Sequence, residues 1–311
     1  MRRTLVWTTA LFSVLFAVFA SVATAEVPKC TGTFTQKTLY SDQGTIENLI
    51  VGGGGTLYTS GTPAGTLGGS LSAYTPGRPP ALVTSTGKAG PGGLAWSSKK
   101  LLWGYGDSAA NGTSGDINPT AGLYSVNIAK KTKSVVSDHL GMANGIARGK
   151  DGSVYASNNL GKKLDRISPS GETTNGWTSL NSANGLSVGK NGKYLYANQM
   201  FETPSTIAKI DTADPSKIYT FYKSPEPLNV LFDGLTRDSE NNLYAAVFAL
   251  GEVWKISPDK EACVLATGLA QTSSVAISSA KKGFKAGNLY AAGFDGKITE
   301  VKNATDAAAP G

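Results

Sequence analysis

The sequence predicts an all-β fold, a six-bladed β-propeller closed by its N-terminal strand, and three observations support this prediction. An apolar residue followed by an aromatic one occurs six times, each time after a turn rich in Gly, Asn or Lys: Leu57-Tyr58, Leu102-Trp103, Val154-Tyr155, Leu195-Tyr196, Leu243-Tyr244 and Leu289-Tyr290. Longer stretches also repeat, because "NGIARGKDGSVYAS" from Asn144 is followed forty residues later by "NGLSVGKNGKYLYAN" from Asn184. The chain is also rich in turn formers, with 38 Gly and 14 Pro, and has no amphipathic run of helical length after residue 25.

Each aromatic strand is expected to be the second of four strands in its repeat. A third strand with alternating polarity follows it: "LSAY" from Leu71, "LYSV" from Leu123, "LDRI" from Leu164, "IAKI" from Ile207, "VWKI" from Val253 and "ITEV" from Ile298. A fourth β-like stretch, such as "PALVTS", "KSVVSD" or "ACVLAT", leads into the next repeat. Six repeats of four short strands are typical of a six-bladed propeller. The stretch "TFTQKTLYS" has no repeat before it, so we expect it to pair with the last blade and close the ring.

The first 25 residues have the layout of a secretory signal peptide. Two arginines precede a long uncharged apolar run, and the small residues Ala23-Thr24-Ala25 predict cleavage before Glu26. The alternative is an uncleaved membrane anchor, which four polar residues argue against: Thr8, Thr9, Ser13 and Ser21. Residues 26–311 are then expected to form a single propeller domain of a secreted, extracellular protein.

The charge and the cysteine content limit the classes of binding partner and the cellular compartment that we expect for this protein. Cleavage removes Arg2 and Arg3 and lowers the net charge from +7 to +5, and the remaining Lys and Arg are scattered in singles and pairs. We therefore expect no nucleic-acid partner, no membrane partner after cleavage, and a monomer. An exported chain with an even number of cysteines predicts a disulfide between Cys30 and Cys263, with two unpaired thiols as the alternative. This bond would tie the closing strand to its neighbour.

The repeat predicts a ring of polar residues at one mouth of the central channel. Near the expected start of each innermost strand, eleven or twelve positions before the aromatic residue, stand Glu47, Gly92, Asn144, Asn184 and Asp233. Ser273 takes this place in the sixth repeat, whose turn "SAKKGFKAG" is longer. Carboxylate and amide oxygens suit a hard divalent cation, with Ca²⁺ as the first expectation and Mg²⁺ or Mn²⁺ next. Zn²⁺ is a less suitable ion, because the chain has a single histidine, His139, which we expect to be solvated.

A simpler reading of these residues is turn chemistry. Asn-Gly and Asp-Gly are favoured turn dipeptides, which would account for Asn144, Asn184 and Asp233 without any ion. Glu47 fits that alternative poorly, since Glu is not a turn former and Asn48 follows it. The aromatic column is expected to be core between blades, and the glycine-rich "VGGGGT" at 51–56 lacks the Lys-Ser/Thr of a phosphate loop, so nucleotide binding is not expected.

Three segments resemble the blade signatures of the regucalcin/gluconolactonase family, which includes luciferin-regenerating enzymes: "ENLIVGGGGTLYTS", "NGLSVGKNGKYLYAN" and "FDGLTRDSENNLYAAVFALGEVWKISPDK". The resemblance extends from about Thr45 to Val301. It implies a six-bladed propeller with one divalent cation at a channel mouth and hydrolysis of sugar lactones. It also implies that Glu47, Asn184 and Asp233 are the metal ligands and that Asn144 contacts the substrate.

Two departures from the family pattern bear on specificity. Met142 stands where the family's lactonases usually have an arginine, two residues before the substrate-contacting asparagine. The acidic residue that often follows the second strand of the third blade has no clear counterpart in "ASNNLGKKLDRI". A gluconolactonase specificity is therefore not implied, although the metal-ligand set is complete.

Two functional classes follow. The first is a secreted metal-dependent hydrolase of a small-molecule lactone or ester, in which Asp233 is the general base as well as a ligand and Asn144 orients the substrate oxygen. Loops 106–122 and 198–206 would then set specificity, with their Asp107, Asn111 and Asp116 expected to be solvated. The second is a non-catalytic secreted binding or scaffold propeller with a structural divalent ion.

Overall fold

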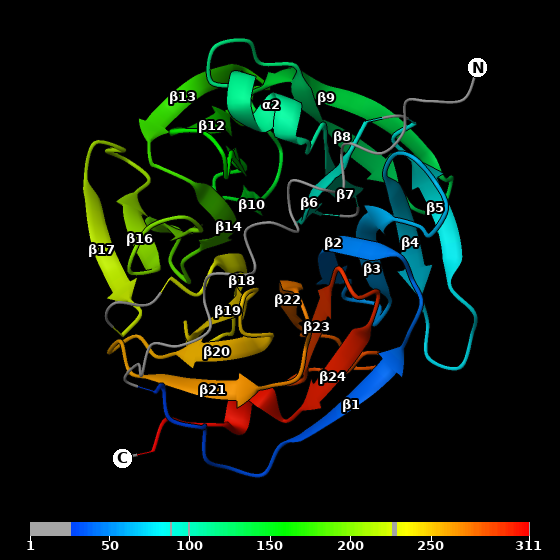
Figure 1. Cartoon of the computed structure of the whole chain (residues 1–311). Coiled ribbons are helices and arrows are strands. Elements are labelled where there is room, and N and C mark those ends of the chain that lie inside the picture. The colour runs from blue at the N-terminus through cyan, green and yellow to red at the C-terminus, as the bar shows by residue number, and fades with distance from the viewer. Residues whose placement is uncertain (1–25, 88, 99, 226–228, 311) are drawn as a thin grey trace, which may run out of the picture.

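The computed structural model of the chain describes residues 26–87, 89–98, 100–225 and 229–310. In these ranges the chain forms six four-stranded sheets, which surround a central axis as the blades of a propeller (Figure 1). The predicted signal peptide, residues 1–25, lies outside the described residues. Within the described ranges, no helix has the length and apolar character that crossing a membrane would require.

The first three blades each take four strands that are consecutive in the sequence. Blade 1 consists of β2 (Thr45–Val51), β3 (Leu57–Thr62), β4 (Ser70–Tyr74) and β5 (Ala81–Ser85). Blade 2 consists of β6 (Pro91–Ser97), β7 (Lys100–Tyr105), β8 (Ala121–Asn127) and β9 (Thr132–Leu140). Blade 3 consists of β10 (Ile146–Arg148), β11 (Val154–Ser157), β12 (Lys163–Ile167) and β13 (Thr173–Ser179). In each blade the first strand lies next to the axis and the fourth lies at the outer edge (Figure 1).

The last three blades follow the same plan until the ring closes. Blade 4 consists of β14 (Ala183–Val188), β15 (Tyr194–Gln199), β16 (Thr206–Asp211) and β17 (Ile218–Lys223). Blade 5 consists of β18 (Phe232–Arg237), β19 (Leu243–Val247), β20 (Glu252–Ile256) and β21 (Ala262–Ala266). Blade 6 consists of β22 (Thr272–Ile277), β23 (Leu289–Gly293), β24 (Ile298–Lys302) and, as its outer strand, β1 (Thr35–Tyr40). The predicted six-bladed fold and its closure by the N-terminal strand are therefore confirmed.

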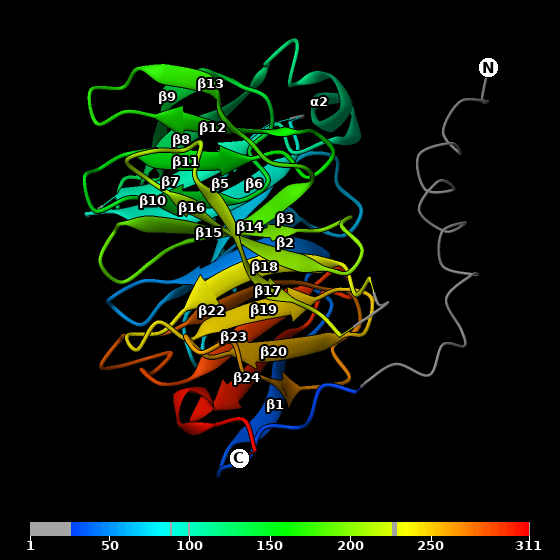
Figure 2. The same ribbon diagram turned by 90° about the vertical axis from the view of Figure 1, so that its left-hand side faces the viewer.

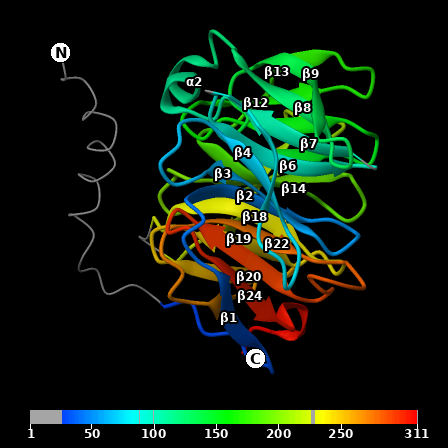
Figure 3. The same cartoon turned by 90° about the vertical axis from the view of Figure 1, so that its right-hand side faces the viewer.

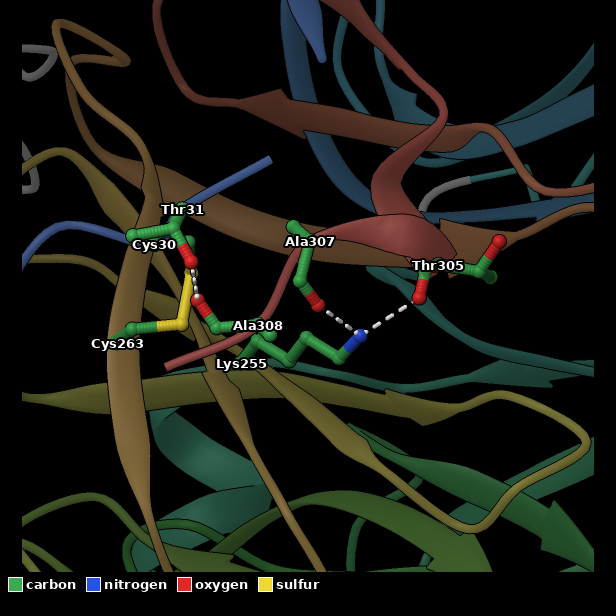
Figure 4. Close-up of a disulfide and its surroundings, with 7 residues drawn as sticks. All are labelled: Cys30, Thr31, Lys255, Cys263, Thr305, Ala307 and Ala308. Atoms are coloured by element: carbon green, nitrogen blue, oxygen red, sulfur yellow. Dashed lines mark hydrogen bonds between the residues drawn. A yellow bond between two sulfur atoms is a disulfide. The ribbon is translucent and has the colours of Figure 1, made fainter. Parts of the chain in front are cut away.

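The segment before β1 also fixes the N-terminal end to blade 5. Cys30 is bonded to Cys263 in β21, with 4.9 Å between their Cα atoms (Figure 4). The backbone N–H of Cys30 donates to the carbonyl of Val264 at 2.9 Å, and Thr31 exchanges two backbone hydrogen bonds with Ala308. The structure therefore contains the disulfide expected from the sequence, and this disulfide joins blade 5 to the segment that leads into the closing strand.

A buried lysine holds the C-terminal segment against the same blade. Lys255 in β20 is 7% exposed, and its Nζ donates to the carbonyls of Thr305 at 2.8 Å and Ala307 at 2.6 Å (Figure 4). Thr305 lies in the short 3₁₀ helix η2 (Ala304–Asp306), directly after the last strand of the chain. Both ends of the described chain are thus attached to blade 5, which complements the strand pairing in blade 6.

The aromatic column is buried between the blades, as expected. All six side chains are at most 8% exposed: Tyr58, Trp103, Tyr155, Tyr196, Tyr244 and Tyr290. Trp103 of blade 2 donates from Nε1 to the Ser60 hydroxyl of blade 1 at 2.7 Å, so the column also contributes polar contacts between blades. These large rings fill the wedge-shaped space between neighbouring sheets and contribute to the packing of the propeller.

A short α-helix, like the 3₁₀ helix η2, departs from the expectation of strands and turns throughout. The connection between β7 and β8 contains a short helix, α2 (Ala109–Ser114), whose N-cap Ser108 accepts a hydrogen bond from the backbone N–H of Asn111. Six residues are too few to produce a periodic apolar pattern, which explains why the sequence did not reveal it. The helix projects from one face of the propeller (Figures 2 and 3).

Candidate functional site

The predicted ring residues lie where the innermost strands begin. Asn184 and Asp233 are the second residues of β14 and β18, Glu47 is the third residue of β2, and Asn144 lies two residues before β10. The pairing of each of these three innermost strands with its neighbour shifts register at this point, as it does between Ile46 and Asn48 around Glu47. Such a bulge bends the strand locally and changes the direction of a side chain.

The Asn-Gly and Asp-Gly pairs in blades 4 and 5 are not turns. Gly185 and Gly234 lie within strands, and neither has the positive φ that the favoured turns require. A Cβ atom on Gly185 would lie 2.3 Å from the backbone nitrogen of Leu235, and one on Gly234 would lie 2.6 Å from the carbonyl oxygen of Ser273. Glycine is needed here because neighbouring innermost strands approach closely around the axis. The turn alternative is therefore wrong for these two pairs.

A second set of residues reaches the same mouth from the ends of the second strands, because these run antiparallel to the first. Asp107, two residues after β7, is the most important of them. The side-chain Nδ2 of Asn144 donates to Asp107 Oδ2 at 3.1 Å and to Glu47 Oε1 at 3.1 Å. Asn144 therefore connects a carboxylate of blade 1 to a carboxylate of blade 2.

The expectation that Asp107, Asn111 and Asp116 are solvated loop residues is wrong for Asp107, whereas Asn111 and Asp116 are partly exposed and bind other parts of the chain. Asp107 joins the site, and Asn111 donates from Nδ2 to the carbonyl of Gly106 at 2.7 Å. Asp116 accepts from Asn158 Nδ2 at 3.0 Å and so ties the α2 loop to blade 3. A signal for Asp107 was present in the sequence, since a residue just after a second strand must lie near the residues that start the first strands.

Three carboxyl groups make this mouth electrostatically unusual, with Asp233 buried and Glu47 and Asp107 half-buried. Burial raises the pKa of Glu47 to about 7, although hydrogen bonds from Asn144 and Asp107 oppose the shift. Burial, followed by the charge of Glu47, raises the pKa of Asp107 well above its ordinary value. The pKa of Asp233 is also raised well above its ordinary value, first by burial and then by the charges of Glu47 and Asp107, while a hydrogen bond from Asn184 lowers it. The three groups repel one another when ionised.

The composition of the site fits a divalent cation, with carboxylate and amide oxygens together as donors. A cavity of about 240 Å³ is lined by Glu47, Asp107, Asn144 and Asp233, and no Lys, Arg or His is among the described residues that line it. Within the described ranges, no group of three or more His, Cys, Asp and Glu side chains is placed so that it could hold a metal ion. An ion would therefore also need amide oxygens, as the sequence-derived set with Asn184 implies.

Asn184 and Met200 lie in contact beside this cavity. The Nδ2 of Asn184 lies 3.2 Å from the sulfur of Met200, which is a weak acceptor, and Met200 itself lines the cavity. The positions of the amide oxygen and nitrogen of Asn184 can be exchanged by a rotation of the side chain. After this rotation the oxygen would take the place of the nitrogen. Asn184 is thus placed beside Asp233 with an amide group whose hydrogen bond to sulfur is weak.

The remaining ring members and His139 do not contribute side chains to the cavity. Ser273 is 1% exposed and its hydroxyl donates to the backbone carbonyl of Ile46, so it joins blade 6 to blade 1. Gly92 has no side chain to offer. His139 lies in β9, exposed and 3.4 Å from Asp138, which agrees with the expectation that it is solvated.

Comparison with known proteins supports the resemblance found in the sequence. The family model described as "SMP-30/Gluconolactonase/LRE-like region" matches residues 155–290, a range that includes Asn184 and Asp233 but not Glu47, Asp107 or Asn144. No curated protein shows significant similarity to the chain.

Solved structures share the fold at low sequence identity. A gluconolactonase from Xanthomonas campestris is 15% identical, with a TM-score of 0.68 over 89% of this chain and 94% of its own. A calcium-binding regucalcin from Agrobacterium tumefaciens is 14% identical, with a TM-score of 0.62 over 84% of this chain and 90% of its own. A virginiamycin B lyase from Staphylococcus aureus is 16% identical, with a TM-score of 0.57 over 87% of this chain and 99% of its own. Because these neighbours differ in chemistry, they establish the fold and leave the reaction to the site.

The chain is thus a six-bladed β-propeller, and the matching region at residues 155–290 agrees with the resemblance to the SMP-30/gluconolactonase/LRE-like family inferred from the sequence.

Proposed function

We propose that this protein is a secreted, divalent-metal-dependent hydrolase that opens a lactone or cleaves an ester. The observation that carries the proposal is the meeting of three carboxyl groups, the buried Asp233 and the half-buried Glu47 and Asp107, at one cavity that no described basic side chain lines. Burying ionised carboxylates is costly unless a cation compensates them. A bound cation would remove this cost and give the site its chemistry.

Glu47, Asn184 and Asp233 are the proposed metal ligands, and the structure suggests Asp107 as a further carboxylate. Ca²⁺ is the ion we propose first, since hard oxygen donors of mixed charge suit it, with Mg²⁺, Mn²⁺ and Zn²⁺ as alternatives for the experiment to separate. When bound, such an ion polarises a carbonyl group and lowers the pKa of water.

A side chain of the protein would then transfer the proton during hydrolysis. We assign Asp233 as the general base that takes a proton from the attacking water. The water oxygen forms a bond to the carbonyl carbon, the ring or ester C–O bond breaks, and the proton ends on the departing alkoxide. Asp233 lines the cavity, so its carboxylate is close to the position that the attacking water would occupy.

Asn144 is the proposed substrate-contacting residue. Both N–H groups of its amide are directed to carboxylates, so its Oδ1 remains as the atom available to a hydroxyl or water hydrogen. Its backbone carbonyl accepts from Asn48 Nδ2 at 3.1 Å, which fixes the segment before β10. This arrangement favours a positioning role toward the substrate oxygen or the attacking water.

The disulfide supports the secreted location that we propose. Disulfides persist in oxidising compartments, and the Cys30–Cys263 bond is buried, with both residues at most 8% exposed. Mass spectrometry of the exported protein would test the predicted cleavage before Glu26.

The decisive experiment combines ion binding with a substrate screen. Chelator-treated protein should gain thermal stability on addition of Ca²⁺ or another of the four ions, because an ion that binds only the folded state stabilises it. The ion-loaded protein should hydrolyse at least one member of a panel of lactones and aryl esters, and the Asp233→Asn variant should lose this activity. Ion binding without any hydrolysis would instead identify the binding propeller with a structural ion. No stabilisation by any ion would refute the metal-dependent hydrolase.

A further inference from the structure

We propose that the ligand of this cavity is an uncharged lactone or ester that carries an apolar alkyl or aryl substituent rather than a sugar lactone. The inference rests on the proposed function for the nature of the reacting group. The apolar substituent is inferred independently, from the walls of the cavity and the rim around it.

Apart from Thr45, Thr62, Ser108 and Asn159, the residues that line the cavity around the carboxylates and Asn144 are apolar. Met142, Met200 and Phe248 line it and are at most 6% exposed. Phe294 from blade 6 completes this part of the lining and packs edge-to-face against Phe248, with ring centroids 5.3 Å apart. Thioether and phenyl groups offer no strong hydrogen bond, so a sugar hydroxyl placed against them would lose water without replacement. An alkyl chain or aryl ring gains from the same contacts.

The apolar surface continues outward from the cavity to the rim. Five blades each present a large, exposed apolar side chain from the connection between their second and third strands: Leu67, Ile117, Leu160, Phe201 and Leu250. Their exposed fractions range from 41% for Leu160 and Phe201 to 90% for Ile117. Leu160 and Phe201 also line the cavity, so they connect its interior to the rim.

These five exposed apolar side chains are gathered on the connections around the mouth of the channel. Among the described residues, the other exposed large hydrophobic side chains lie on the outermost strands β5, β9 and β17: Leu82, Val135, Ile218 and Tyr219. On the connections that surround the mouth, apolar groups recur in blade after blade although water contact there is unfavourable. A ligand whose tail extends from the cavity to this rim would cover Leu160 and Phe201.

The charge of the site excludes anionic ligands. Three carboxyl groups face the cavity and no described Lys, Arg or His lines it, so one divalent cation leaves the ionised site with net negative charge. An acid or a phosphorylated sugar would be repelled. A neutral carbonyl compound is not repelled by the negative charge of the carboxyl groups. Its apolar tail can pack against the apolar side chains that line the cavity.

The test uses two ligand series on the Ca²⁺-loaded, full-length mature protein. The first is a set of γ-butyrolactones with unbranched alkyl substituents from methyl to hexyl, compared with gluconolactone in a hydrolysis assay. The second is the corresponding set of 2-pyrrolidinones, which resist hydrolysis and allow Kd to be measured by calorimetry. We expect both KM and Kd to fall by about fourfold per added methylene until the tail passes the rim.

Two rim variants and a matched control identify the surface that binds the tail. Leu160→Ser and Phe201→Ser should each raise Kd for the hexyl pyrrolidinone by about tenfold and leave Kd for the methyl compound nearly unchanged. Leu82→Ser, which changes an equally apolar side chain that is 57% exposed on β5, should change neither value. Because all three positions are exposed, these substitutions should leave the fold intact.

The outcomes separate this inference from the proposed function. Tail-length dependence that the rim variants abolish supports the inference, even if no lactone is hydrolysed, in which case only the hydrolase proposal fails. Hydrolysis of gluconolactone in preference to every alkyl lactone would overturn the inference while the hydrolase proposal stands. Pyrrolidinone binding that is independent of tail length, or equally weakened by Leu82→Ser, would also overturn it.

Discussion

Replacing Glu47 by glutamine should stabilise the metal-free protein at pH 8 and destabilise the calcium-loaded protein at the same pH. Burial raises the pKa of this carboxyl group from 4.5 to about 7, so the folded state binds the proton more tightly than the unfolded state does. Stability is therefore highest below pH 4.5, declines as the pH rises toward 7, and stays lower above it. Glutamine has no charge to lose and removes this penalty.

The size of the effect follows from the shift. At 1.36 kcal/mol per pKa unit, the difference between 4.5 and about 7 corresponds to about 3 kcal/mol at pH 8. With an unfolding entropy of about 2.1 cal/mol/K per residue, a propeller of this length should gain about 5 °C in Tm. Loss of repulsion toward Asp107 and Asp233 acts in the same direction, since Glu47 raises the pKa of both.

Thermal unfolding between pH 4.5 and 8 measures both the expected gain in Tm with chelator and the expected loss in Tm with Ca²⁺. In chelator, the Tm of the variant should exceed that of the wild type by an amount that grows with pH. In Ca²⁺ the order should reverse, because the variant lacks a ligand. Glu172→Gln, at an exposed turn glutamate, is the control and should show neither effect. A variant that is less stable than the wild type by the same amount in chelator and in Ca²⁺ would refute the reasoning.

Three further predictions concern the third carboxylate and the attachment of the chain ends. Asp107→Asn should weaken Ca²⁺ binding by about tenfold in calorimetry, because it removes one of three charges from the site; an unchanged Kd would exclude Asp107 from the ion's surroundings. Replacing Cys30 and Cys263 together by serine should lower the free energy of unfolding by up to about 5 kcal/mol in denaturant titration, since the bond closes a loop with a sequence separation of 233; wild-type protein that is equally stable with and without reductant would contradict this. Lys255→Met should cost about 2 kcal/mol in the same assay by leaving two C-terminal carbonyls without their donor, whereas Lys302→Met at an exposed position should cost little.

Much of the fold could be predicted because its signals are local and repeated. Each blade carries its own turn, its own apolar-aromatic pair and its own alternating third strand, and six copies reinforce one another. The unpaired strand at 35–40 predicted the closure, because an edge strand left without a partner is unfavourable. Helix α2 could not be predicted, because its six residues, which follow the N-cap Ser108, are too few to show a helical period of apolar residues.

For the site, the sequence by itself determined the ring of first-strand residues, because equal spacing in each repeat places Glu47, Asn144, Asn184 and Asp233 at equivalent positions around the axis. Only the tertiary structure decided what surrounds them. The position of Asp107 just after a second strand places it near this mouth, but its contact with Asn144 depends on the path of a connection with no repeat in the other blades. The apolar walls come from residues that follow second strands in blades 4, 5 and 6 and from Met142, which precedes the first strand of blade 3. The physical reason is that a surface assembled from single residues of separate blades leaves no continuous pattern in any one of them.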